Sequence, residues 1–129
     1  MQLNKLLGSA LLMLSFNAVA DIKLTQDDLL GSWQIDKESV NSDGSNARGM
    51  NTTWVFRADG TMEGTTEDND ANARVNQLKA VLNYSVADGK LNKQSAPGRS
   101  KMETCVAIEK EGSKLVLKCQ SVYFFMTKK

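Results

Sequence analysis

The side chains that most often carry out catalysis or bind metals are scarce in this sequence. The chain has 129 residues, two cysteines and no histidine. Histidine is the commonest general base and metal ligand, so its absence leaves the serines without their usual activating partner. No nucleophile-elbow, phosphate-loop or dinucleotide-binding glycine motif occurs in the chain. The sequence therefore predicts a protein that is not an enzyme, with no catalytic residues, no metal and no cofactor.

Four carboxylates gather in one stretch of the chain, at Glu63, Glu67, Asp68 and Asp70. Calcium binds oxygen ligands of this kind, but the stretch lacks the ordered spacing of an EF-hand loop. Paired carboxylates can also hydrolyse glycosides, and that chemistry needs a defined cleft. We interpret the stretch as a solvated acidic loop, and an enzyme with these groups at its mouth is the weakest hypothesis.

The two cysteines, Cys105 and Cys119, flank a polar turn at residues 109–114 between two β-rich runs. A hairpin register that places them opposite each other mixes apolar and polar side chains on each face. A register shifted by one residue aligns the apolar side chains but puts the cysteines on opposite faces. A β-bulge reconciles the two registers. We predict a Cys105–Cys119 disulfide; the alternative is a reactive or metal-binding pair, although two thiols without histidine make a poor zinc site.

The first twenty residues have the three parts of a secretory signal peptide. Lys5 supplies a positive charge, residues 6–16 form an apolar run, and residues 18–20 read Ala-Val-Ala. The run is shorter than the ~20 residues that span a bilayer, and a buried N-terminal helix is the alternative interpretation. We expect cleavage near Ala20 and a mature domain of residues 21–129, periplasmic or secreted. The residue directly after the cleavage site is Asp21 and not a cysteine, so the new N-terminus is not expected to accept a lipid anchor.

Removal of the signal also balances the charge of the mature chain. The whole chain has 16 basic and 15 acidic residues, and one of the basic residues is Lys5. A neutral domain has no overall field that attracts nucleic acid or an anionic membrane. No later segment is long and apolar enough to span a membrane. Export also places the cysteines in a compartment where disulfides persist.

Turn signals recur at short intervals along the mature chain, as is typical of an all-β meander. Asp-Gly pairs at residues 59–60 and 88–89 separate β-prone runs and favour hairpins. The predicted strands are residues 32–40, 50–57, 61–66, 80–86, 91–95, 101–109, 114–119 and 122–126. Eight antiparallel strands of this length close most economically on themselves. The predicted fold is a single all-β, eight-stranded antiparallel barrel.

Two short helical segments interrupt the strands in this prediction. Thr25 and Asp28 match a capping box, and Gly31 ends the helical turn that follows. A second short helix is predicted near residues 69–79, because apolar residues there fall at helical spacing. That helix is expected to lie across one end of the barrel.

Several short motifs occur in an order and spacing that a known family shares. Gly31 and Trp33 form a G-x-W motif after the helical turn, and residues 54–61 read W-x-F-x-x-D-G-T. Hairpin sequences at residues 84–91 and 112–117 follow. The chain thereby resembles the lipocalin-like (calycin) barrels, particularly small bacterial lipocalin-like domains. The resemblance implies that Trp33 closes one end of the barrel, entered by a tight turn at Gly31, with a basic side chain such as Lys128 stacked on the ring.

The same resemblance implies an interior that is either filled or holds one small ligand. The predicted lining comprises Trp54, Phe56, Tyr84 and one face of residues 122–126, including Phe124. Lys37 shares the period-two parity of Trp33 and is a candidate partner for an anion near the open end. The alternatives are that the aromatic side chains are ordinary core and that Lys37 faces solvent.

The leading hypothesis is an exported binding protein, expected to be a monomer, that holds a small apolar or amphipathic molecule in a mostly apolar cavity. The alternative is a filled barrel that binds a protein through its loops, for example as an inhibitor or immunity-type partner of an envelope hydrolase. Ligand binding by the purified protein separates the two hypotheses.

Overall fold

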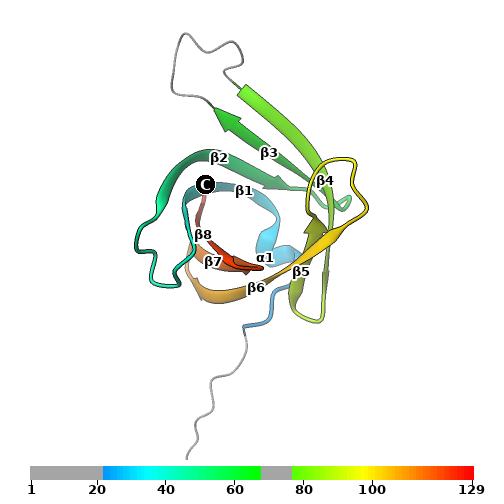
Figure 1. Cartoon of the computed structure of the whole chain (residues 1–129). Helices are drawn as coiled ribbons and strands as arrows, with labels where there is room; N and C mark the ends of the chain where they lie inside the picture. Colours follow the sequence, from blue (N-terminus) through cyan, green and yellow to red (C-terminus); the bar gives the residue numbers. More distant parts are fainter. Residues whose placement is uncertain (1–21, 68–76) are drawn as a thin grey trace, which may run out of the picture.

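The computed structural model describes residues 22–67 and 77–129, which form one short helix and eight strands. The elements are α1 (Gln26–Leu29), β1 (Gly31–Ser39), β2 (Arg48–Phe56), β3 (Thr61–Glu67), β4 (Gln77–Ala87), β5 (Lys90–Gln94), β6 (Met102–Glu111), β7 (Lys114–Cys119) and β8 (Val122–Lys128). Each strand pairs antiparallel with the next, and β8 returns to β1, so that the sheet closes into a barrel (Figure 1). The predicted eight-stranded all-β barrel is confirmed.

Two predictions fall wholly or partly outside the described residues. The expected signal peptide, residues 1–20, is one of them. The other is most of the helix expected at residues 69–79. Its last residues, 77–79, belong to β4, where they pair with residues 65–67 of β3. That part of the helix prediction is wrong, because pairing with β3 overrides the local helical spacing.

One end of the barrel carries α1 and the β2–β3, β4–β5 and β6–β7 turns, and we call it the closed end. The predicted capping box is present there: Thr25 Oγ1 accepts from the Asp28 backbone N–H, and the Thr25 N–H donates to Asp28 Oδ2 at 2.8 Å. The bond from the Thr25 backbone lowers the pKa of Asp28, and Lys110 adds to the shift. A lowered pKa means that this contribution to stability is present above the ordinary carboxyl pKa and is lost as the pH falls through the folded-state pKa.

The opposite end is formed by the β1–β2, β5–β6 and β7–β8 connections, and we call it the open end. The barrel core lies between the two ends and draws residues from every strand. Its fully buried side chains are Leu29, Ile35, Phe56, Met62, Leu91, Cys105, Leu115, Leu117 and Met126. Within the described ranges, no helix is long and apolar enough to cross a membrane.

The cysteines form a disulfide inside this core. Cys105 on β6 lies opposite Cys119 on β7 and is bonded to it. The register between the two strands shifts between Ala107 and Glu109. This β-bulge places Glu109 opposite Val116 and Lys110 opposite Leu115. Cys119, Leu117 and Leu115 share the inner face of β7, whereas Ile108, at the bulge in β6, is 39% exposed. The predicted disulfide is confirmed, and a bonded pair is neither a free thiol nor a metal site.

Candidate functional site in the barrel interior

The four aromatic residues predicted to line the barrel lie against one another in its interior. Trp54 and Phe56 are alternate residues of β2, with ring centroids 6.3 Å apart. Phe56 packs edge-on against Tyr84 of β4 at 5.1 Å, and Trp54 packs on Phe124 of β8 at the same distance. The structure therefore brings together side chains from three strands that are far apart in the sequence.

Hydrogen bonds of Tyr84 attach the aromatic cluster to the closed end of the barrel. The Tyr84 hydroxyl donates to the Arg57 carbonyl at 2.6 Å and lies 3.2 Å from Gln26 Nε2, which donates to it. These bonds tie β4 to the turn after β2 and to α1. The Tyr84 hydroxyl is thus engaged in fixing the closed end, while its ring forms part of the interior wall.

Trp33 occupies the closed end itself, and only 4% of it is exposed. Its indole Nε1–H donates to the Leu29 carbonyl at 2.8 Å, which attaches β1 to α1. The Lys128 ammonium lies 5.4 Å from the Trp33 ring centroid. Gly31 has a φ of 110°, in a region that other residues rarely adopt, and a Cβ there would lie 3.4 Å from Lys128 Cε. Trp33 is therefore attached to α1 at the closed end, with the Lys128 ammonium beside its ring.

A buried ion pair lies beside the aromatic cluster. Lys93 of β5 is only 6% exposed, and its ammonium contacts the carboxylate of Glu103, its cross-strand partner on β6. The same ammonium lies 5.6 Å from the ring centroid of Trp54. Burial of charges is costly unless they are paired. Lys93 is buried, the Glu103 side chain is 16% exposed, and the Lys93 ammonium also lies against an aromatic ring.

Lys93 and Glu103 were not among the residues predicted from the sequence. Both can be found by parity: Lys93 alternates with the buried Leu91, and Glu103 alternates with the buried Cys105. A charged side chain at the end of such a series is usually assumed to face solvent. No local sequence pattern indicates that Lys93 and Glu103 lie opposite each other on neighbouring strands.

The interior also contains groups that resemble a metal site only in composition. One carboxylate oxygen of Glu103 and the sulfur atoms of Cys105 and Cys119 lie within 4.8 Å of one another. Since the two sulfurs are bonded to each other, they are not available as thiolate ligands. Glu103 instead has Lys93 as its charged partner.

The acidic stretch predicted to be a solvated loop is partly described. Glu63 forms an ion pair with Arg57 at 3.0 Å, and Glu67 accepts from Gln77 Nε2 at 3.4 Å. Asp68 and Asp70 lie outside the described residues. The carboxylates that are described belong to β3 and have protein partners.

The interior position predicted for Lys37 is wrong. A register shift between Ile35 and Lys37 inserts a β-bulge into β1, after which Lys37 pairs with Phe125 and Glu38 pairs with Phe124. Since Phe124 packs on Trp54 inside the barrel, Lys37 and Phe125 point outwards. A one-residue bulge reverses the parity of every residue that follows it.

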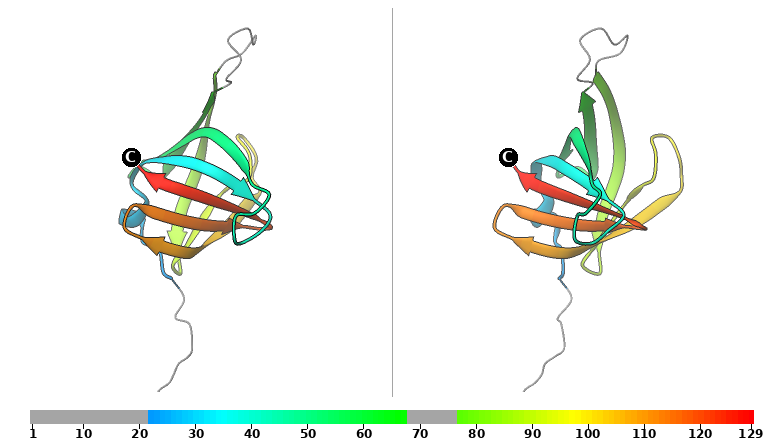
Figure 2. Two further views of the ribbon diagram at one scale, coloured as in Figure 1. Left: turned by 90° about the vertical axis from the view of Figure 1, so that its left-hand side faces the viewer. Right: turned by 60° about the vertical axis from the view of Figure 1, so that its left-hand side comes forward.

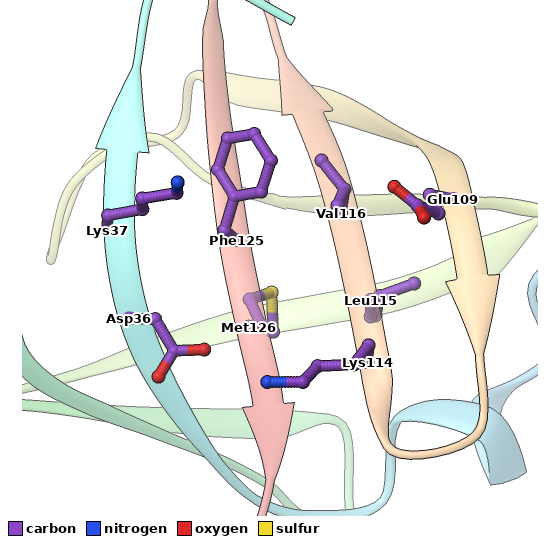
Figure 3. A pocket seen from close by; sticks show the side chains of 8 residues that line it. All are labelled: Asp36, Lys37, Glu109, Lys114, Leu115, Val116, Phe125 and Met126. Carbon is purple, nitrogen blue, oxygen red and sulfur yellow. The ribbon is translucent and has the colours of Figure 1, made fainter. Parts of the chain in front are cut away.

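Lys37 lies instead along a shallow groove of about 450 Å³ on the outer wall. Its ammonium is 4.8 Å from the centroid of the Phe125 ring. In Figure 3, Lys37, Phe125, Val116 and Glu109 form a row across β1, β8, β7 and β6. Leu115 and Met126, which belong to the buried core, also line this groove.

Comparison with known proteins gives a likeness of fold. No family model and no curated protein matches the chain. A lipocalin-like protein from Bacteroides uniformis has a TM-score of 0.61 and 16% identity over 79% of this chain and 99% of that one. An uncharacterized protein from Bacteroides eggerthii also has a TM-score of 0.61, with 10% identity over 78% of this chain and 99% of that one. The chain has a lipocalin-like fold, as the resemblance of its sequence motifs implies.

Proposed function

We propose that this chain is an exported binding protein that holds a small amphipathic molecule inside the barrel. The apolar part of the ligand packs on Trp54 and Phe124, and its polar end meets Lys93 and Glu103. The ligand enters from the open end, because Trp33 and Lys128 cover the other. No step of bond chemistry is assigned to the site.

The observation that carries this proposal is the ion pair of Lys93 and Glu103 against Trp54. Apolar residues of similar volume in place of a buried ion pair are often as stabilising or more so. A charged pair in an apolar interior therefore suggests a purpose other than stability. In ligand cavities, a few polar groups within an apolar lining fix the orientation of the ligand, and this pair is suitably placed to do so.

Export is part of the proposal and has two supports. The signal-like residues 1–20 are the first. The second is the buried Cys105–Cys119 disulfide, since disulfides persist mainly in oxidising compartments. Cleavage near Ala20 leaves residues 21–129 as the working domain in the periplasm or outside the cell.

The close packing of the interior favours one other function. Trp54, Tyr84 and Lys93 are each less than 10% exposed, as in a barrel filled by its own side chains. Such a barrel would act through the connections at its open end, where Ser39 Oγ donates to the Ser45 carbonyl at 2.7 Å and holds the β1–β2 loop. Loops fixed on a rigid scaffold are suited to binding another protein, so a protein-binding module is the second candidate.

Removal of the ion pair tests the ligand-binding proposal. The double variant Lys93→Met/Glu103→Gln removes both charges together, so that neither is left buried and unpaired. We expect wild-type protein to bind at least one of decanoic acid, decanol and decylamine, measured by calorimetry. Charge-assisted hydrogen bonds contribute ~1.5–3 kcal/mol each, so the double variant should bind that probe about tenfold more weakly or worse.

The matched control is Lys90→Met/Glu111→Gln, which makes the same two substitutions at exposed positions of the same strands. It should bind the probe as the wild type does. Wild-type protein that binds none of the three probes would overturn the ligand-binding proposal and favour the protein-binding module. An equal loss of affinity in both double variants would remove Lys93 and Glu103 from the site.

A further inference from the structure

Strands β4 and β5 are paired along only a short part of β4. The two strands pair from Tyr84↔Lys93 to Ala87↔Lys90. On its other side, β4 pairs with β3 along residues 77–83. Within the described part of the chain, residues 77–83 therefore have a strand on one side and an open edge on the other. Figure 2 shows the β3–β4 hairpin projecting beyond the ring of the other strands.

Backbone hydrogen bonds show which groups point towards this edge. The Tyr84 N–H donates to the Gly60 carbonyl at 2.9 Å, on the β3 side. The preceding N–H, of Asn83, donates the other way, to Oε1 of the Gln94 side chain at 2.6 Å. Because the direction alternates along an antiparallel strand, the N–H and C=O groups of Val81 and Lys79 point towards the open edge. At Asn83 the side chain of Gln94 accepts the backbone hydrogen bond that a neighbouring strand would otherwise accept.

The side chains at this edge are unusually apolar for an exposed position. Leu78 is 65% exposed and Val81 is 52% exposed. The single charge in residues 77–83 is Lys79. An exposed, apolar edge strand with free backbone groups is a template for pairing with another strand.

We propose that β4 pairs antiparallel with β4 of a second copy of this chain, about a two-fold axis at Ala80. In this register Lys79 of each copy exchanges backbone hydrogen bonds with Val81 of the other. Leu78 of one copy lies opposite Leu82 of its partner on the inner face. The contact is isologous, since each pair occurs twice.

The sequence of the edge favours a second copy as the partner, and it favours this register over the one with Lys79 opposite Lys79. Residues 78, 80 and 82 are Leu, Ala and Leu, which read alike in both directions, so the strand is complementary to itself. The register with Lys79 opposite Lys79 places like charges directly across from each other, which is destabilising. The register centred on Ala80 separates the two ammonium groups and pairs each with a valine. This assembly departs from the monomer expected from the sequence, and it does not depend on ligand binding.

Sedimentation velocity over a range of concentrations tests the proposal. Wild-type protein should show a reversible monomer–dimer equilibrium. Val81→Lys puts a lysine opposite Lys79 at two places in the dimer and should raise the dissociation constant about tenfold. The double variant Lys79→Glu/Val81→Lys creates two cross-strand pairs of opposite charge and should restore dimerisation. Val40→Lys, at an exposed apolar side chain on another part of the surface, should change nothing.

Several results would overturn the proposal. A wild-type chain that stays monomeric at every concentration excludes it, as does a chain that pairs with a foreign β-strand peptide but not with itself. A dimer that persists unchanged in Val81→Lys must use another surface. If Lys79→Glu/Val81→Lys does not restore the dimer although its circular dichroism is that of the wild type, the register centred on Ala80 is excluded.

Ala80→Cys is an independent check of the register. In the proposed dimer the two residues at position 80 form a non-hydrogen-bonded pair, whose Cα atoms lie ~4.5 Å apart. The variant should therefore form a disulfide-linked dimer.

Discussion

Replacement of Trp33 by alanine is expected to lower the free energy of unfolding by about 3–5 kcal/mol. Trp33 is 4% exposed and is hydrogen-bonded to α1 at the closed end. Its removal leaves a cavity, deprives the Leu29 carbonyl of its indole donor and uncovers the side chain of Lys128. Urea titration followed by circular dichroism measures the change, because the midpoint falls while the slope stays nearly constant if unfolding remains two-state.

Trp33→Phe separates packing from hydrogen bonding. Phenylalanine keeps an aromatic ring at the closed end but cannot donate to the Leu29 carbonyl. We expect a smaller loss than for Trp33→Ala, on the order of 1–3 kcal/mol for the unsatisfied carbonyl and reduced packing. Equal losses for the two variants would contradict the packing argument, and a loss below about 1 kcal/mol for Trp33→Ala would show that this ring does not close the barrel.

The Cys105–Cys119 disulfide is expected to contribute about 3 kcal/mol to stability, the value for a closed loop of roughly 15 residues in the chain-entropy model. The two cysteines are separated by 14 positions in the sequence and are both buried. Reduction of the wild-type protein should therefore lower its melting temperature by several degrees or more. Calorimetry with and without reductant measures this difference.

The double variant Cys105→Ala/Cys119→Ala provides the control. It should be less stable than oxidised wild-type protein by a similar amount, and reductant should not alter its melting temperature. If the wild-type protein melts at the same temperature with its thiols fully reduced, the disulfide does not stabilise the fold. An effect of reductant on the alanine variant would mean that the reductant acts on something other than this bond.

The strand order and the closed barrel were predictable because turn signals and alternating apolar residues repeat along the chain. Side-chain direction was predictable only up to the first irregularity. The bulge after Ile35 moves Lys37 to the outer wall, and a period-two pattern contains no mark of where one residue is inserted. A bulge in the cysteine hairpin is predictable, because no single register puts the cysteines and all the apolar residues of both strands on one face. Its outcome is not predictable, since Ile108 lies at the bulge and is 39% exposed.

The interior ion pair shows a different limit of sequence-based prediction. The parity of Lys93 with Leu91 is visible in the sequence, but burial of a lysine is favourable only with a partner. That partner, Glu103, is brought opposite Lys93 by the β5–β6 register. The open edge of β4 was missed for a related reason, since it arises from the unequal lengths of two neighbouring strands. Because the sequence predicts a helix at residues 77–79, the predicted strand begins at residue 80 and is shorter than β4.

The central claim, a ligand site inside the barrel, can be tested with the two tryptophans of the chain. Trp54 lies in the proposed site, and Trp33 lies at the closed end. In Trp33→Phe the fluorescence reports on Trp54 alone, and in Trp54→Phe it reports on Trp33 alone. Quenching by a bromine-labelled fatty acid, titrated against both variants, is therefore the most direct measurement. Trp33 and Trp54 are cross-strand partners on β1 and β2, but the Trp54 ring packs on Phe124 whereas the Trp33 indole is bonded to Leu29. The proposed site predicts saturable quenching in Trp33→Phe that is stronger than the quenching in Trp54→Phe; no saturable quenching in Trp33→Phe would contradict it.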